Sequence, residues 1–243
     1  MLFFSKKTIL KDLIPEDHID FHSHLLFGID DGAKTFEDSL GLIKSLTDFG
    51  INHFITTPHV MQHVWENTTE IIVNRQHQVN ELLKQNNLPV TLKAAAEYLL
   101  DDYFAQLFKK ESLLTLKDNY VLVEMSYINA PLQLYEIIFD LQVAGYIPVL
   151  AHPERYNFYH QNFTEYKRLK KAGCLFQLNL LSAVGYYGEG VAKTAQQLLH
   201  QGMIDFASSD THHKNHIAAF EGKVILKDLK PLQAAITNTA FFK

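Results

Sequence analysis

The stretch IDFHSHLLFGIDDG, residues 19–32, places two histidines one residue apart at the end of a short apolar run. In a β-strand, a residue and its second neighbour point to the same side. If the strand continues through both, His22 and His24 present their imidazoles to one spot, where they can bind a metal ion. On this stretch alone, a chance placement of two histidines near a turn is an equally good interpretation.

Apolar runs and amphipathic patterns alternate along the rest of the chain. The apolar runs predict seven strands, at residues 19–21, 51–56, 91–96, 120–124, 147–151, 175–179 and 204–208. The amphipathic patterns predict helices at residues 36–49, 66–86, 101–109, 131–144, 164–171 and 191–200. Strict alternation with short connections is typical of a parallel sheet, either closed into a barrel or open. No G-x-G-x-x-G or G-x-x-x-x-G-K-[ST] loop follows a strand, so the usual signature of an open nucleotide-binding sheet is missing.

The composition limits the organisation and the class of partner. A chain of 243 residues with 47% hydrophobic content can form one large α/β domain, which we place at residues 19–243 after an N-terminal arm at residues 1–18. The formal net charge of −5 argues against a nucleic-acid partner. A single cysteine excludes an internal disulfide and a cysteine-rich zinc site, in line with a reducing cytoplasm. No long apolar run or signal peptide is apparent, so we expect no membrane insertion and a cytoplasmic location.

Metal-binding side chains occur at the ends of most predicted strands. In (β/α) barrels the chemistry lies at the carboxyl ends of the strands. Six of the seven predicted strands end in histidine, aspartate or glutamate, and these residues are His22, His24, His59, Glu97, Glu124, His152, Asp210 and His212. Asp30 and Asp31 in the first loop are further candidates. Carboxylates at the end of an apolar strand are costly to bury without a partner or a metal. Taken together, these strand ends make chance a poor explanation.

The mixture of ligand types indicates which metals fit. Histidine together with carboxylate suits Mn²⁺, Fe²⁺ or Zn²⁺ better than Mg²⁺ or Ca²⁺. Eight or nine ligands are too many for one ion, so the pattern predicts two or three bridged ions that activate water and hold a phosphoryl group. Amidohydrolases also begin with His-x-His, but they use a bridging lysine in mid-barrel. Here Glu97 and Glu124 stand at those strand ends instead.

With these residues in place, the sequence resembles the polymerase-and-histidinol-phosphatase (PHP) superfamily, in particular its branch of bacterial capsule and exopolysaccharide tyrosine-protein phosphatases. The ordered motifs that carry the resemblance are DFHSHLLFGIDDGAKT, TTPH, AAEY, VEMS, AHPERY and SSDTHH, which span residues 19 to about 217. The resemblance implies a distorted (β/α)7 barrel and a trinuclear site, usually with Mn²⁺, for which Fe²⁺, Zn²⁺ or Co²⁺ are alternatives. It also implies hydrolysis of phosphotyrosine on a protein, typically a tyrosine kinase that regulates polysaccharide chains.

The resemblance also assigns ligands to three ions. It implies one ion at His22, His24, Glu97 and Asp210, a second at Glu97, Glu124 and His152, and a third at Asp31, His59 and His212. Asp30 competes with Asp31 for the third ion, because the two aspartates are adjacent in the loop.

Arg155 matches the phosphate-binding arginine of the family, and a bidentate contact with phosphate oxygens suits its position after a strand end. The chain departs from the family in its N-terminal arm, an extension that could alter how the subunits of a homo-oligomer pack. It also lacks a second arginine beyond His212. Lys214 or His216 stands in that region instead, and His213 and His216 are candidate general acids.

The predicted function is therefore hydrolysis of phosphotyrosine by a metal-activated hydroxide, without a phosphoenzyme. The cysteine-phosphatase motif C-x5-R is absent, because Leu180 stands where that motif needs arginine after Cys174. Alternatives are a phosphatase for a small ester such as histidinol phosphate, a nuclease or polymerase-editing module, which the acidity disfavours, and a PHP binding module without catalytic activity.

Overall fold

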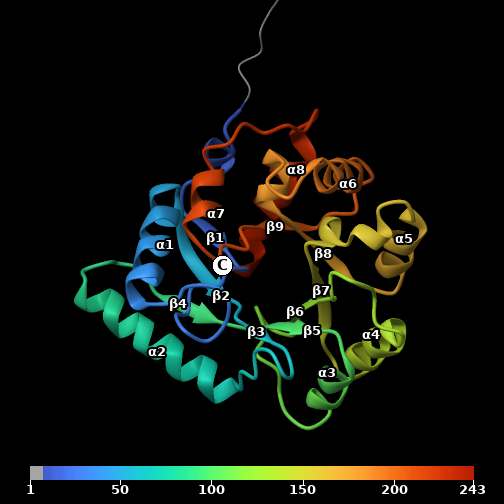
Figure 1. Ribbon diagram of the computed structural model, residues 1–243, viewed down its shortest axis with the longest axis horizontal. Coiled ribbons are helices and arrows are strands. Elements are labelled where there is room, and N and C mark those ends of the chain that lie inside the picture. Colours follow the sequence, from blue (N-terminus) through green and yellow to red (C-terminus); the bar gives the residue numbers. More distant parts are fainter. Residues whose placement is uncertain (1–7) are drawn as a thin grey trace, which may run out of the picture.

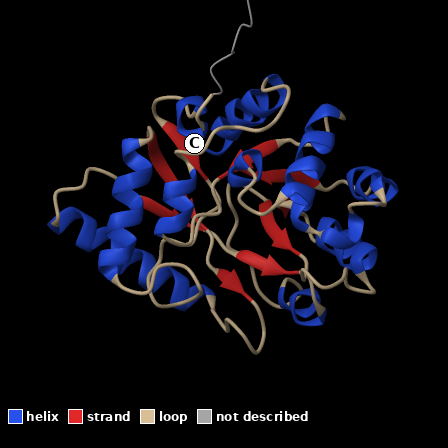
Figure 2. Cartoon of the chain, turned by 45° about the horizontal axis from the view of Figure 1, so that its top comes forward, coloured by secondary structure: helices blue, strands red, loops and turns tan. Residues whose placement is uncertain are grey.

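A computed structural model describes residues 8–243, in which short parallel strands form an inner ring and helices cover its outside (Figures 1 and 2). The strands are β1 (His18–Asp20), β2 (Ile51–Thr56), β3 (His59–Val60), β4 (Leu92–Ala94), β5 (Glu97–Leu99), β6 (Tyr120–Glu124), β7 (Ile147–Ala151), β8 (Leu175–Asn179) and β9 (Phe206–Ser208). All seven predicted strands are present. The second and third are each continued by a short extra strand, β3 and β5.

Two sheets make up the ring, with strand orders β1-β2-β4 and β3-β5-β6-β7-β8-β9. The chain passes from β2 into β3 and from β4 into β5 with only two residues between strands, so these pairs act as two long bent strands. Hydrogen bonds continue across the bend, from the Ala95 N–H to the Thr56 carbonyl (2.9 Å) and from the Glu97 N–H to the Pro58 carbonyl (3.1 Å). Pro58 itself has no N–H to donate, which suits a position at an interruption of the ladder.

β1 and β9, each at the edge of its sheet, meet just beyond their carboxyl ends. Ser23 and Thr211 form an isolated parallel bridge. On either side of it, the Asp210 N–H donates to the His22 carbonyl (2.7 Å) and the His24 N–H to the Thr211 carbonyl (2.9 Å). This contact completes the ring of seven strand units, and the predicted distorted (β/α)7 architecture is confirmed.

The outer layer consists of α1 (Phe36–Asp48), α2 (Thr69–Gln85), α3 (Asp102–Leu107), α4 (Leu134–Val143), α5 (Phe163–Lys171), α6 (Glu189–His200), α7 (Lys214–Ala219) and α8 (Lys230–Asn238). A capping box opens α1, where Thr35 and Asp38 cap one another. The second predicted helix begins at Thr69 and not at residue 66, because the Thr68 hydroxyl accepts the Ile71 N–H and fixes the start there. The short α7 and the C-terminal α8 were not predicted.

The interior of the ring is filled by apolar side chains below the carboxyl ends of the strands. Phe21, Phe206 and Phe242 form its centre, and the Phe21 and Phe242 rings lie 4.3 Å apart between centroids. Phe242 belongs to the last turn of the chain, and the C-terminus lies beside β1 in Figure 1. The barrel is therefore a packed core, and polar chemistry is confined to the end of the ring above it.

The N-terminal residues that the structure describes pack on the C-terminal segment that follows α7. The Leu10 N–H donates to the Gly222 carbonyl and the Val224 N–H to the Thr8 carbonyl, and Leu10 is fully buried. The second half of the predicted arm thus belongs to the packed body, while residues 1–7 lie outside the described residues. The division into an arm and one barrel domain stays a prediction. In residues 8–243, no helix is long and apolar enough to cross a bilayer.

Candidate metal centre

The nine predicted metal ligands meet at the carboxyl end of the ring. Glu124 ends β6, and the residues that follow β1, β7 and β9 are His22, His24, His152, Asp210 and His212. His59 and Glu97 begin the short strands β3 and β5, just beyond the bends, and the loop between β1 and α1 adds Asp31. Three overlapping groups have ligand atoms within 4.8 Å of one another, namely His22, His24, Glu97 and Asp210; His59, Glu97 and Glu124; and His24, Asp31, His59 and His212. His152 adjoins the second group.

The first group has four fully buried members. His22 Nε2 lies 3.2 Å from Glu97 Oε2 and 3.2 Å from Asp210 Oδ1. His24 Nε2 lies 3.3 Å and 3.4 Å from the same two oxygens. Two imidazole nitrogens and two carboxylate oxygens thus surround a single position, as the ligands of one ion do.

The second group is centred on Glu97 and Glu124. His152 Nε2 lies 3.2 Å from Glu97 Oε1 and 4.0 Å from Glu124 Oε2. His59 Nδ1 is closer to Glu124, at 3.0 Å from Oε1, and also lies 3.3 Å from Glu97 Oε2. His59 therefore stands between the second and third groups, whereas the resemblance assigned it to the third ion alone.

The third group lies nearest to solvent. Asp31 Oδ1 is 3.3 Å from His59 Nε2 and 3.5 Å from His212 Nε2, and the Asp31 side chain is 51% exposed. The His212 ring stacks on His24, with 3.9 Å between centroids. The open position of this group gives an incoming molecule access to the centre.

Many inward-facing atoms of the centre have no hydrogen-bond partner in the described part of the chain. They are His22 Nε2, His24 Nε2, His59 Nδ1, both Glu97 oxygens, Glu124 Oε1 and Asp210 Oδ1. Buried polar atoms without partners are rare and costly in folded proteins. Because these atoms converge and are all metal-ligating types, the residues present fit bound cations.

The charges of the centre also favour the binding of cations. Burial alone would raise the pKa values of Glu97 and Asp210, but the surrounding imidazoles hold both well below the ordinary range. Burial would likewise lower the pKa of His22, yet Glu97 and Asp210 raise it to about 10. The carboxylates therefore require nearby positive charge, which protons on the histidines supply when metal ions do not. Metal binding would displace those protons.

Hydrogen bonds behind the ligands fix two of the histidine rings. His22 Nδ1–H donates to Gln177 Oε1 at 2.8 Å, and His24 Nδ1–H donates to Asp30 Oδ2 at 2.7 Å. Both rings consequently point Nε2 into the centre, an arrangement that orients ligands and raises their basicity. Gln177 lies on β8, which corresponds to the one predicted strand, residues 175–179, that ends without a predicted ligand. The polar residues Gln177 and Asn179, on the same face of an apolar strand, were the signal that sequence reasoning missed.

The adjacent Asp30 and Asp31 have different positions. Asp30 is buried, and besides His24 it accepts the Gly32 N–H at 2.9 Å, whereas Asp31 faces His59 and His212. The geometry therefore favours Asp31 as the ligand and Asp30 as the group that orients His24. Gly32 allows this loop to pass close to the backbone of His24, because a Cβ at position 32 would lie 2.2 Å from the His24 carbonyl oxygen.

Replacing Asp30 with asparagine tests this orienting role. Asp30→Asn keeps the shape of the side chain but removes the charge that holds His24, so we expect metal affinity to fall about 10- to 100-fold. Isothermal titration of the metal-free protein measures it. Asp140→Asn, which alters only a surface ion pair with Lys109, is the control. An Asp30→Asn protein with the affinity of the control would contradict the assignment.

Two candidate ligands stand on left-handed backbone. His152 has φ 35° and Asp210 has φ 50°. Such values are uncommon for residues other than glycine and persist where the surroundings enforce them, often at functional sites. For His152 the enforcing contact is a hydrogen bond from its N–H to Gln177 Oε1 (3.4 Å), and for Asp210 it is the β1–β9 junction.

Arg155 lies beside the first group, and two tyrosines flank it. Its Nη1 donates to Asp210 Oδ2 at 2.6 Å. The guanidinium carbon lies 4.8 Å from the Tyr127 ring centroid and 4.2 Å from that of Tyr187. Asn179 Nδ2 also donates to Asp210 Oδ2, at 2.9 Å. The structure thus holds a fixed cation next to the predicted ligands, where it can contact a phosphoryl group.

The two predicted general acids lie beyond the ligand groups. His213 is exposed at the start of α7, and His216 is buried, with its Nδ1 accepting the His212 N–H at 3.1 Å. Burial and the neighbouring His212 and His213 lower the pKa of His216 to about 3. The protonated form is therefore disfavoured, and His216 supports the backbone of the ligand loop. Lys214 is exposed on α7.

Comparisons with known proteins identify relatives of this chain. Over residues 18–219 the chain matches the family model described as capsular polysaccharide synthesis, CpsB/CapC. It is 31% identical over 196 residues to the tyrosine-protein phosphatase YwqE of Bacillus subtilis, covering 80% of this chain and 77% of that protein.

Two solved structures resemble the fold. One comes from crystallography of YwqE from Bacillus subtilis and CpsB from Streptococcus pneumoniae, described as unique metal-dependent tyrosine phosphatases. It has a TM-score of 0.78 and 27% identity, and covers 93% of this chain and 88% of that one. The other is histidinol phosphate phosphatase from Lactococcus lactis, with a TM-score of 0.52, 12% identity and 94% coverage of both chains, a likeness in fold alone. On the family match, which extends over most of its length, this chain belongs to the CpsB/CapC family.

Proposed function

We propose that this protein is a metal-dependent protein-tyrosine phosphatase. The observation that carries the proposal is the convergence of unpartnered, buried imidazole and carboxylate atoms beside the Arg155 guanidinium. Metal-ligating groups next to a fixed cation suit the transfer of a phosphoryl group to water. The relationship to proteins named tyrosine-protein phosphatases supports phosphotyrosine as the substrate.

The proposed centre holds three ions, with Mn²⁺ the expected metal and Fe²⁺, Zn²⁺ or Co²⁺ as alternatives. The holding residues are His22, His24, Asp31, His59, Glu97, Glu124, His152, Asp210 and His212. Bound cations would supply a lowered pKa for water and neutralisation of phosphoryl charge. Glu97 is the shared ligand in this proposal, because its two oxygens face different groups.

The protein's own residues would bind and orient the phosphate ester. Arg155 offers planar N–H donors to the phosphoryl oxygens. Tyr127 stacks on His152 with 5.6 Å between centroids, and its side chain is partly exposed. A tyrosinate leaving group has a pKa of about 10, so it departs with less help from an acid than an alkoxide needs. This property makes an active-site acid less necessary and agrees with the low pKa of His216.

The partner in this proposal is a phosphotyrosine-bearing protein, in particular a bacterial tyrosine kinase that acts in capsule or exopolysaccharide synthesis. The capsule family of the chain supports this choice. We also propose a cytoplasmic location, where such a kinase presents its phosphorylated segment.

Steady-state kinetics on two substrates test the proposal. We expect the Mn²⁺-loaded protein to hydrolyse a phosphotyrosine peptide with kcat/KM at least about 100-fold above that for histidinol phosphate, a ratio that requires a substrate-specific site. Protein stripped with a chelator is the control, and its activity should return when Mn²⁺ is restored. A preference for histidinol phosphate would identify a small-ester phosphatase instead. No activity on either substrate with Mn²⁺ would indicate a binding module.

A further inference from the structure

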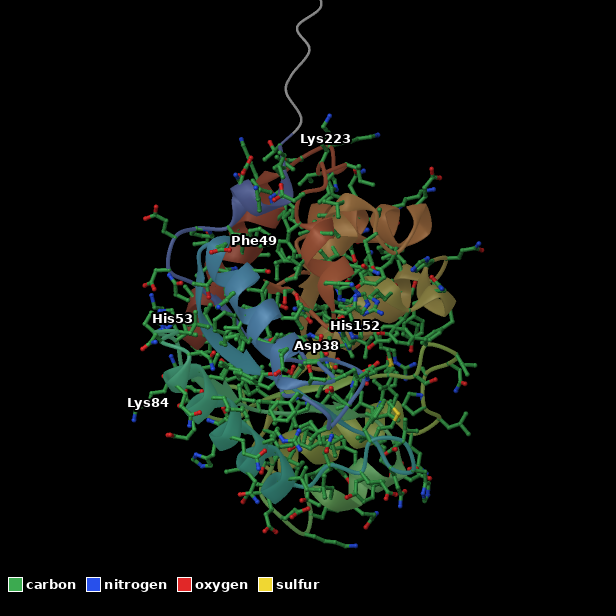
Figure 3. The ribbon with its side chains drawn as sticks, turned by 60° about the vertical axis from the view of Figure 1, so that its left-hand side comes forward. Asp38, Phe49, His53, Lys84, His152 and Lys223 are labelled. Carbon is green, nitrogen blue, oxygen red and sulfur yellow. The ribbon has the colours of Figure 1, made fainter. Side chains whose placement is uncertain are left out.

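A groove leads away from the metal centre between α1 and α7. It has a volume of about 560 Å³, and Asp31 and His212 of the third ligand group form its inner end. The remaining lining residues are Gly32, Ala33, Lys34, Glu37, Asp38, Gly41, Leu42, Ser45, His213, Lys214 and Ile217. α1 and α7 lie side by side in Figure 1, and Asp38 and Phe49 in Figure 3 mark the two ends of α1. We call this feature the α1–α7 groove.

A glycine in the middle of α1 keeps the groove open. Gly41 is exposed and has ordinary helical backbone, and a Cβ built on it would meet nothing within 4 Å. Glycine is the least favourable residue in a helix interior apart from proline. Neither the backbone nor a close internal contact requires glycine here. What it provides is a smooth helix surface that another chain can approach closely.

The chemistry of the groove suits a polypeptide better than a small anion. Leu42, Ala33 and Ile217 give it an apolar floor, and exposed polar groups stand along both sides. Lys214 projects from α7 and Glu37 from α1, so each side carries a different charge. An extended peptide combines apolar side chains with backbone donors and acceptors, which match such a surface.

We propose that the α1–α7 groove binds the polypeptide segment that flanks the phosphotyrosine of the protein substrate. This inference rests on the proposed function. When the phosphoryl group of the substrate lies at Arg155 and the ligand groups, the rest of the substrate protein lies at the open side of the centre. The groove begins there, at Asp31 and His212. Free phosphotyrosine or an aryl phosphate is too short to occupy it.

A leucine at Gly41 tests this inference, because its side chain would occupy groove space and its Cβ meets no atom within 4 Å in the folded protein. The substrates are p-nitrophenyl phosphate and a phosphotyrosine peptide with several residues on each side. For Gly41→Leu we expect kcat/KM for the peptide to fall about tenfold, chiefly through KM, since a lost contact at the centre of an interface has that size. Turnover of p-nitrophenyl phosphate should stay unchanged. For the peptide, kcat/KM of Gly41→Ala should lie between the value of the wild type and that of Gly41→Leu.

Gly190→Leu is the matched control, because Gly190 is also exposed in a helix, and a Cβ there makes only ordinary contact with His160. Equal peptide kinetics for Gly41→Leu, the control and the wild type would overturn the groove as a peptide site. An equal loss on both substrates would do so too, because it would reflect damage to the metal centre. If the wild type hydrolyses p-nitrophenyl phosphate but no phosphotyrosine peptide, the proposed function itself fails.

Discussion

Glu97→Gln is expected to reduce kcat for phosphotyrosine peptides by about 10³-fold or more, at least the loss typical of removing a major electrostatic stabiliser. Glu97 Oε2 lies within 3.3 Å of His22, His24 and His59, and Oε1 lies 3.2 Å from His152. The amide of glutamine has one oxygen and an NH₂ group that cannot bind a cation. One substitution therefore removes a ligand from two groups at once. Rate measurements at saturating Mn²⁺, with metal content determined on the same sample, test this expectation.

Glu154→Gln provides a matched control. Glu154 is also fully buried and adjacent to Arg155, but it accepts hydrogen bonds from the Asn179 N–H (2.9 Å) and the Ser182 hydroxyl (2.7 Å) and belongs to no ligand group. Burial raises its pKa to about 7, so an uncharged side chain is already accessible near neutrality. We expect its substitution to leave most of the activity. Similar losses for both variants would mean that general disruption of the core, and not loss of a ligand, explains Glu97→Gln.

Arg155→Ala is expected to lower kcat/KM by about 10²- to 10³-fold and to weaken inhibition by inorganic phosphate, because the fixed cation beside the centre is lost. Arg155→Lys should recover only part of this loss, since a single ammonium cannot make the two parallel contacts of a guanidinium. Arg168→Ala is the control: the chain has three arginines, and Arg168 lies exposed on α5 near Glu165. Unchanged phosphate inhibition in Arg155→Ala would exclude Arg155 from the phosphate site.

The sequence was most informative where local chemistry and chain order agree. Strand after strand ended in a metal-ligating residue, and parallel strands bring their carboxyl ends to one side of a barrel. This rule gathered His22, Glu97 and Asp210 although more than 100 residues separate Glu97 from Asp210. The capping box at Thr35 was equally predictable, because it depends on residues three positions apart.

Features that depend on distant partners were not predictable in the same way. The bends between β2 and β3 and between β4 and β5 arise where this pair of strands passes from one sheet into the other, and apolar alternation does not report which sheet a strand joins. Phe242 fills the ring from the far end of the chain. The adjacent aspartates were ambiguous in sequence, and only the burial of Asp30 against His24 separates them.

We propose that nine side chains at one end of the barrel form a centre for three cations. Anomalous diffraction at the Mn absorption edge, from crystals of Mn²⁺-loaded protein, tests this proposal directly. We expect three peaks: one enclosed by His22, His24, Glu97 and Asp210, one beside Glu124 and His152, and one beside Asp31 and His212. A map with fewer than three peaks among these side chains would contradict the three-cation centre.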